Sequence, residues 1–230
     1  MTVFDLDRGR EVLAFARIGR IRNAVLTLSA VRDHRGELFP GEATYAATVA
    51  DKRGREFSTG RRMAREGLER IGVDPCEIPS EDRRPVWPEG VVGSIGHSRG
   101  LAAAIVGPAD AFDGLGIDIE TENAVSGSTA DRLLTEAEHA WLPAPEWRTM
   151  IFAAKEAVYK SVNPMVREFL GFQDVEIDVD AEVGVFRARC IGHRPSSEPI
   201  AAGYGYWALY RAHWMVVFEI RAPRTAGAAT

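Results

Sequence analysis

The sequence predicts an α+β protein with two antiparallel sheets, each carrying a long helix. Apolar residues recur at helical spacing near residues 55–71 and again near 146–161, and alternating apolar stretches follow each helix. This repeated order suggests two related halves, although sequence identity between them is negligible. A boundary near Gly107 gives halves of residues 1–107 and 108–221, and we expect residues 222–230 to form a flexible tail.

The first half is expected to contain a strand over residues 24–28, a helix from Pro40 to about residue 50, and a stronger amphipathic helix. The second helix is predicted from an apolar face of Phe57, Ala64, Leu68 and Ile71. Arginines lie at its start and on its opposite face, at Arg53, Arg55, Arg61 and Arg65. Either a solvated basic face or an anion site fits this pattern.

A glycine-rich stretch, Val91–Gly100, leads into the apolar strand Leu101–Val106 and lacks the Gly-Lys-Ser/Thr ending of a phosphate loop. Turn residues after it predict that Leu101–Val106 and Leu115–Glu120 are antiparallel neighbours. His97 then lies on a strand that adjoins the second of these. It is either a hydrogen-bonded structural residue or a ligand contact.

The second half is expected to begin with a short helix and a long one. Thr135 and Glu138 have the spacing of a capping box, and a helix from about Pro145 to Ser161 follows. Alternating apolar residues beyond it predict four strands of one sheet, near residues 175–179, 184–191, 204–210 and 213–220.

Composition limits the class of protein. The chain has 230 residues, is 46% hydrophobic and carries a formal net charge of −5, which argues against nonspecific nucleic-acid binding. No apolar run approaches the roughly 20 residues of a membrane span, and the N-terminus lacks a signal-peptide pattern, so a cytoplasmic protein is expected. Cys76 and Cys190 are expected to be reduced thiols.

The run from Gly116 to Glu120 places two carboxylates on one side of a strand. Alternation turns Ile117 and Ile119 toward a core, whereas Asp118 and Glu120 share the other face. Two positions along a strand span roughly 7 Å, so both acids can reach one hard cation such as Mg²⁺. The alternative is an edge strand with solvated acids.

A second group of charges lies on the helix of residues 145–161. Glu156 and Lys160 are one turn apart, and Lys155 precedes them. If Glu156 joins Asp118 and Glu120 at one Mg²⁺, the lysines can complement phosphate oxygens, and a glutamate can take a proton from an attacking hydroxyl. A surface ion pair between Glu156 and Lys160 is the alternative.

These two segments resemble the paired motifs of 4′-phosphopantetheinyl transferases. The residues are Gly116-Ile117-Asp118-Ile119-Glu120 and Phe152-Ala153-Ala154-Lys155-Glu156-Ala157-Val158-Tyr159-Lys160. Trp87-Pro88, Ser94-Ile95-Gly96-His97 and the arginine-rich helix are similar to the large Sfp-type branch, especially its enterobactin-synthetase-like members. The resemblance extends from about Pro40 to Phe172.

The resemblance implies a monomer of two similar halves related by a pseudo-twofold, with the active site between them. It implies transfer of 4′-phosphopantetheine from coenzyme A to a serine of an apo acyl or peptidyl carrier protein, without nucleic acid or membrane. Mg²⁺ would be held by Asp118, Glu120 and Glu156, and Glu156 would act as the base. Contacts to coenzyme A would come from Lys155, Lys160, His97, Arg53, Arg61 and Arg84.

Two departures from the family pattern affect these assignments. Ile119 stands where some relatives have an acid, so water would take that metal position. The segment before Pro85 lacks the glycine and lysine often found there, which weakens the assignment of Arg84. The alternatives are a coenzyme A or carrier-protein binding module without turnover, a Mg²⁺-dependent nuclease, and a structural acid–lysine network.

Overall fold

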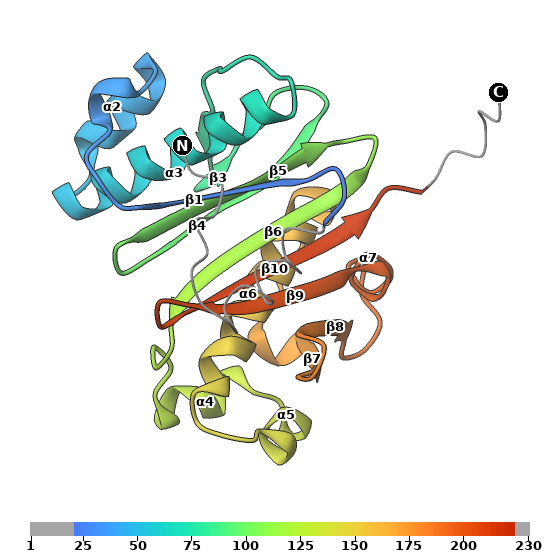
Figure 1. Cartoon of the computed structure of the whole chain (residues 1–230). Coiled ribbons are helices and arrows are strands. Elements are labelled where there is room, and N and C mark those ends of the chain that lie inside the picture. The colour runs from blue at the N-terminus through green and yellow to red at the C-terminus, as the bar shows by residue number, and fades with distance from the viewer. Residues whose placement is uncertain (1–20, 224–230) are drawn as a thin grey trace.

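The computed structural model describes residues 21–223, so most of the predicted tail, from residue 224 on, lies outside the described residues. Two antiparallel sheets stack between two long helices, α3 (Asp51–Arg70) and α6 (Trp147–Val166) (Figure 1). The predicted α+β fold with one long helix on each sheet is therefore confirmed. Among the described helices, none has the length and apolar character needed to cross a bilayer.

The first sheet has the strand order β1-β5-β4, formed by β1 (Val25–Ala30), β5 (Leu101–Pro108) and β4 (Val91–Ser98). Helix α3 covers one face, where its Met63, Ala64 and Leu68 pack against Ala104 and Val106 of β5. A 3₁₀ turn, η1 (Arg35–Glu37), and α2 (Pro40–Thr48) precede α3, and a small hairpin, β2 (Ser80–Glu81) and β3 (Arg84–Pro85), follows it. The strand and both helices predicted for this half are present.

The second sheet has the order β6-β10-β9-β8-β7. Its strands are β6 (Phe112–Thr121), β7 (Val175–Asp180), β8 (Val185–Cys190), β9 (Tyr204–Tyr210) and β10 (His213–Arg221). All four strands predicted beyond residue 174 are therefore present in one sheet. The shorter helices are α4 (Gly127–Leu133), α5 (Glu136–Trp141), η2 (Phe172–Asp174) and α7 (Ser197–Ala202).

Successive side chains along β6 and β10 point alternately to the core between the sheets and to α6. On β6, Leu115, Ile117 and Ile119 enter the core between the two sheets, so the intervening residues face α6. On β10, Met215 and Val217 join the same core, whereas alternate residues pack beneath α6. This arrangement turns the acid-bearing face of β6 toward the long helix.

The predicted pairing of Leu101–Val106 with Leu115–Glu120 is wrong. Both edges of β5 are occupied, by β1 and β4, so the chain crosses at residues 109–111 into the other sheet, where β6 pairs with β10. The first sheet meets β6 through β4, and a Cβ added at Gly96 of β4 would lie 3.2 Å from the Ile117 carbonyl oxygen. His97 therefore does adjoin the acid-bearing strand, as expected.

Candidate functional site

Two glycines allow α6 to lie directly on β6. A Cβ built at Gly116 would stand 1.9 Å from the carbonyl oxygen of Ala157, and one at Gly114 would stand 2.4 Å from that of Ser161. Any side chain at these positions would push the helix away from the strand. The glycines thus bring the acids of β6 within reach of the charged residues of α6.

Asp118 and Lys160 form the centre of the site. The Lys160 ammonium donates to Asp118 Oδ1 at 2.6 Å and to the Ile117 carbonyl at 3.2 Å. The second carboxylate oxygen of Asp118, Oδ2, is buried and has no hydrogen-bond partner among the described residues. The alternative interpretation, a surface ion pair of Glu156 with Lys160, is not observed, because Lys160 pairs with Asp118 instead. A buried carboxylate oxygen without a donor is costly and marks a place for a ligand.

Glu120 and Glu156 flank this pair. Glu120 is half-buried and accepts a hydrogen bond from Ser98 Oγ at 3.1 Å, so Asp118 and Glu120 are not the solvated acids of an ordinary edge strand. Burial raises the pKa of Glu120, and the Asp118 charge adds to the rise. Burial also raises the pKa of Glu156, although Lys160 partly offsets it. Sequence reasoning missed Ser98, which carries no distinctive motif.

The charge of Lys160 is stabilised by the acids around it. Burial disfavours its charged form, but Asp118, Glu156 and Glu120 outweigh that cost and raise the pKa of Lys160. An ammonium that keeps its charge can donate to the oxygens of an anionic substrate.

We tested whether the three acids suit Mg²⁺. Among residues 21–223, no three acidic, histidine or cysteine side chains are close enough together to hold a metal ion as they stand. The donor chemistry nevertheless fits, because hard carboxylate oxygens are the ligands that Mg²⁺ prefers, and Asp118 Oδ2 is buried and unpartnered.

His97 and Arg53 lie at the border of the site. An Arg53 nitrogen contacts His97 Nε2, and His97 Nδ1 lies 3.4 Å from a Glu56 carboxylate oxygen. Burial, with a further contribution from Arg53 and Lys160, lowers the pKa of His97 to about 4. His97 is therefore neutral at physiological pH: its Nε2 accepts from Arg53, and its one N–H lies on Nδ1, which faces Glu56.

Arg61 and Arg65 do not form the solvated basic face that was one interpretation of α3. Their exposed fractions are only 4% and 8%. Arg65 makes two hydrogen bonds to Glu42, at 3.0 and 2.8 Å, whereas Arg61 donates to the Ile78 carbonyl and to Ser80 Oγ. Arg65 is held in this way because Glu42, which no motif singled out, is buried beneath α3.

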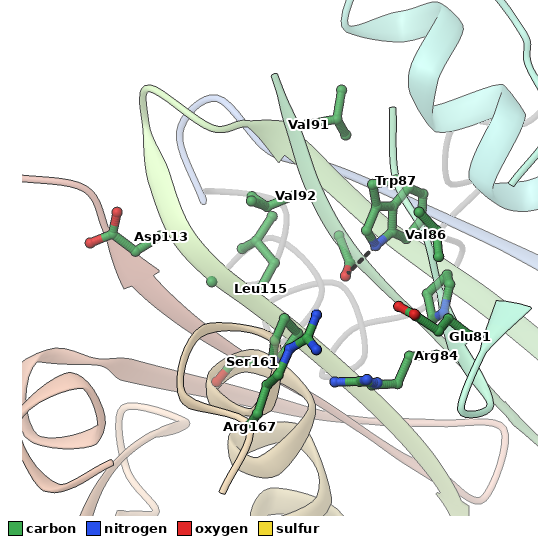
Figure 2. A pocket seen from close by; sticks show the side chains of 14 residues that line it. Glu81, Arg84, Val86, Trp87, Val91, Val92, Asp113, Leu115, Ser161 and Arg167 are labelled. Carbon is green, nitrogen blue, oxygen red and sulfur yellow. Dashed lines mark hydrogen bonds between the residues drawn. The ribbon is translucent and has the colours of Figure 1, made fainter. Parts of the chain in front are cut away.

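Arg84 projects from the β2–β3 hairpin toward α6, where it donates to Asn163 Oδ1 at 3.0 Å. It shares a cavity of about 280 Å³ with Trp87, whose indole nitrogen donates to the Gly93 carbonyl. Figure 2 shows Arg84 and Arg167 extending into this cavity from its two walls. A smaller cavity of about 110 Å³ on the Lys160 side is also lined by Arg84 and Trp87.

Lys155 lies outside the acid cluster. Its side chain is 2% exposed, and its ammonium donates to Glu138 Oε2 and to the Leu133 and Phe172 carbonyls, each at 2.7 Å. An ammonium has three donors, and all three are used within the protein. The structure thus separates Lys155 from Lys160, which sequence reasoning had placed together.

A groove of about 280 Å³ adjoins the acid cluster on the side of Glu156. Apolar residues dominate its lining, which comprises Arg83, Lys155, Glu156, Tyr159, Phe169, Leu170, Gly171, Phe172 and Val175. Phe169 is 81% exposed, so an apolar surface lies open beside a carboxylate. Sequence reasoning did not identify this groove, because it forms from α6 and the segment that follows it.

The chain matches models of one family over most of its length. The 4′-phosphopantetheinyl transferase N-terminal domain matches residues 41–107, and the 4′-phosphopantetheinyl transferase superfamily matches residues 114–209. The acid cluster lies within the second of these ranges.

Curated relatives agree with the family models. The chain is 35% identical over 184 residues to 4′-phosphopantetheinyl transferase PptT of Mycobacterium tuberculosis, with 75% of this chain and 81% of that protein covered. It is 34% identical over 202 residues to 4′-phosphopantetheinyl transferase Svp of Streptomyces mobaraensis, covering 84% and 81%. Enterobactin synthase component D of Salmonella typhimurium is 36% identical over 124 residues, half of each chain. The chain therefore belongs to the 4′-phosphopantetheinyl transferase family.

Proposed function

We propose that the protein transfers 4′-phosphopantetheine from coenzyme A to a serine of an apo acyl or peptidyl carrier protein and releases adenosine 3′,5′-bisphosphate. Membership of the family supports the reaction class. The single observation that carries the proposal is the Lys160 ammonium between β6 and α6, whose charge Asp118, Glu120 and Glu156 stabilise and beside which Asp118 Oδ2 has no hydrogen-bond partner among the described residues.

Mg²⁺ would be held by Asp118, Glu120 and Glu156 in this proposal. When bound, the ion would neutralise charge on the pyrophosphate of coenzyme A. The unpartnered oxygen of Asp118 and the raised pKa values of Glu120 and Glu156 support a site that gains from added positive charge.

Glu156 is proposed as the general base. The serine hydroxyl oxygen forms a bond to the phosphorus that carries the pantetheine arm, the bond from that phosphorus to the bridging oxygen breaks, and adenosine 3′,5′-bisphosphate departs with that oxygen. The serine proton goes to the Glu156 carboxylate. Because burial raises the pKa of Glu156, this carboxylate is a stronger base than an exposed glutamate.

The remaining contacts follow from where each cation lies. Lys160 keeps its charge and faces the pyrophosphate. Arg53 and Arg84 are assigned to the nucleotide end, where neutral His97 lies beside Arg53. Because Arg61 already donates to Ile78 and Ser80, we assign it the support of the β2–β3 hairpin rather than a phosphate contact. In this proposal the nucleotide is held mainly by residues 1–107, and the metal by residues 108–221.

The pantetheine arm is assigned to the groove beside Glu156. Its walls, formed by Tyr159, Phe169, Leu170 and Phe172, are apolar, as a chain with a dimethyl-substituted carbon and an ethylene thiol tip requires. The groove adjoins the base, so an arm lying there would present its phosphate to Glu156.

The test is the intact mass of an apo carrier protein after incubation with the protein, coenzyme A and Mg²⁺. We expect a gain of one phosphopantetheine mass that is lost with EDTA or with Glu156→Gln. Glu69→Gln changes an exposed acid of α3 in the same way and should keep the activity. A folded protein that binds coenzyme A but modifies no fatty-acid, polyketide or peptide carrier would be a binding module instead.

A further inference from the structure

The ion pair between Lys155 and Glu138 ties four chain segments to α6. Lys155 holds the end of α4 through the Leu133 carbonyl and the start of η2 through the Phe172 carbonyl. Glu138 accepts from the Thr135 backbone nitrogen at 2.7 Å and, through its other oxygen, from the Ile177 nitrogen at 2.8 Å. α5 and β7 are thereby attached to the same pair.

Both members of the pair are saturated. Glu138 is completely buried, and each of its oxygens accepts at least one hydrogen bond. Neither side chain has a free polar atom that could reach a substrate. A buried ion pair is often replaceable by apolar residues without loss of stability, so stability alone does not require these charges. These charges contribute geometric specificity, because each of their hydrogen bonds fixes the position of one backbone group.

The fixed groups lie at the groove beside the base. Lys155 and Phe172 line the groove together with Glu156, the residue that follows Lys155 in the chain. The bond from Lys155 to the Phe172 carbonyl holds the Phe169–Phe172 segment against the turn of α6 that carries Glu156. The ring of Phe152 also packs on Phe172, with centroids 5.4 Å apart.

We infer that Lys155 and Glu138 are positioning residues, whose buried pair sets the wall of the groove and so its fit to the pantetheine arm, without contact to phosphate. This inference rests on the proposed function. It separates the two lysines of α6 by role: Lys160 faces the substrate, whereas Lys155 shapes the groove that holds it.

The test compares two ligands that share the nucleotide but differ in the arm. The double variant Lys155→Met with Glu138→Gln removes both charges and keeps an acceptor for the Ile177 amide. We expect its affinity for coenzyme A to fall about tenfold, as slight misplacement of a ligand wall produces, and its affinity for adenosine 3′,5′-bisphosphate to stay within about twofold. In turnover, KM for coenzyme A should rise about tenfold and kcat should change less than about threefold.

If the affinities for both ligands fell equally, Lys155 would contact phosphate. If both affinities were unchanged, the pair would be purely structural. Either outcome overturns the inference. Glu136→Gln, an exposed acid on the same short helix, is the matched control. If the double variant does not fold, Glu138→Gln alone is measured the same way. Faster amide exchange at residues 169–174 is expected in the double variant, which loses the bond from Lys155 to the Phe172 carbonyl, whether or not the wild-type protein turns over. Inactivity of the wild type toward every carrier would contradict the proposed function instead.

Discussion

The long helices of the two halves, α3 and α6, both bury charged side chains against their sheets, but only one of the two networks is complete. Each helix has 20 residues. Under α3, Glu42 is 1% exposed, and both of its carboxylate oxygens have partners: Arg65, the Ile78 nitrogen and the Phe39 nitrogen. A satisfied network of this kind holds a structure together.

The network under α6 is left incomplete at the acid cluster. One oxygen of Asp118 has no donor, and among the described residues no hydrogen bond to the Glu156 carboxylate is formed. The same helix carries the saturated Lys155–Glu138 pair one residue away. An unpartnered carboxylate oxygen, rather than buried charge itself, therefore distinguishes the acid cluster from the networks of Glu42 and Glu138.

The largest effect should come from Glu156→Gln. Loss of the base is expected to lower kcat about a thousandfold, within the range for general-base catalysis. The free energy of unfolding should not fall, because burial disfavours the charge that the substitution removes. Mass-based turnover and urea denaturation measure the two quantities. If stability dropped with activity intact, Glu156 would belong with the structural acids.

The opposite result is expected for Arg65→Met under α3. The substitution leaves Glu42 buried without its main cation, which typically lowers the free energy of unfolding by about 3 kcal/mol. Activity per folded molecule should be unchanged. Urea denaturation and turnover at a temperature where the variant is folded provide the check. A loss of turnover in the folded variant would place this network in the active site.

One glycine-to-alanine substitution at each long helix would show how closely that helix packs on its sheet. Gly116→Ala would place its Cβ 1.9 Å from a backbone oxygen of α6 and should cost about 2 kcal/mol, with loss of activity as the helix shifts. Gly60→Ala, within α3, meets only the Ile95 Cγ2 methyl at 2.7 Å, and alanine gains up to about 1 kcal/mol in a helix interior. Denaturation midpoints of the two variants should therefore differ clearly; similar midpoints would contradict the close approach at Gly116.

Local patterns in the sequence predicted the elements and part of the site. The apolar spacing of α3, the capping box at Thr135 and the alternation of β6 depend on residues a few positions apart, and all are observed. The pairing of β6 was predicted wrongly because its partner, β10, lies almost 100 residues later in the chain. Glu42 and the groove depend on similarly distant contacts, which no local pattern reveals.

For the two lysines of α6, helical spacing in the sequence was enough to predict that they lie on different faces of the helix. Five residues of a helix turn through roughly 500°, so Lys155 and Lys160 lie about 140° apart around the axis. Glu156 and Lys160, four residues apart, share a face. The motif alone assigned both lysines to phosphate, whereas helical geometry already separates Lys155 from that face.

The smallest effect, and the finest distinction between the two networks, lies in pH dependence. A base must be ionised, so activity should rise with pH as Glu156 loses its proton above the ordinary glutamate value of 4.5. Stability should move the opposite way. In that window the folded state keeps a proton that the unfolded state has released, so the contribution of Glu156 to the free energy of unfolding falls as pH rises.

His97 has the opposite effect on stability. Because its pKa is lowered to about 4, its contribution to the free energy of unfolding is lost as pH falls from 6.5 toward 4. The difference between wild type and Glu156→Gln cancels His97 and isolates the glutamate. We expect that difference, measured by urea denaturation from pH 4.5 to 8, to show wild type losing stability relative to the variant as pH rises. The same comparison for Glu69→Gln should be flat. A wild type that gained stability over Glu156→Gln with rising pH would mean that this carboxylate is stabilised when ionised, as in the completed network of Glu42, and is not the base.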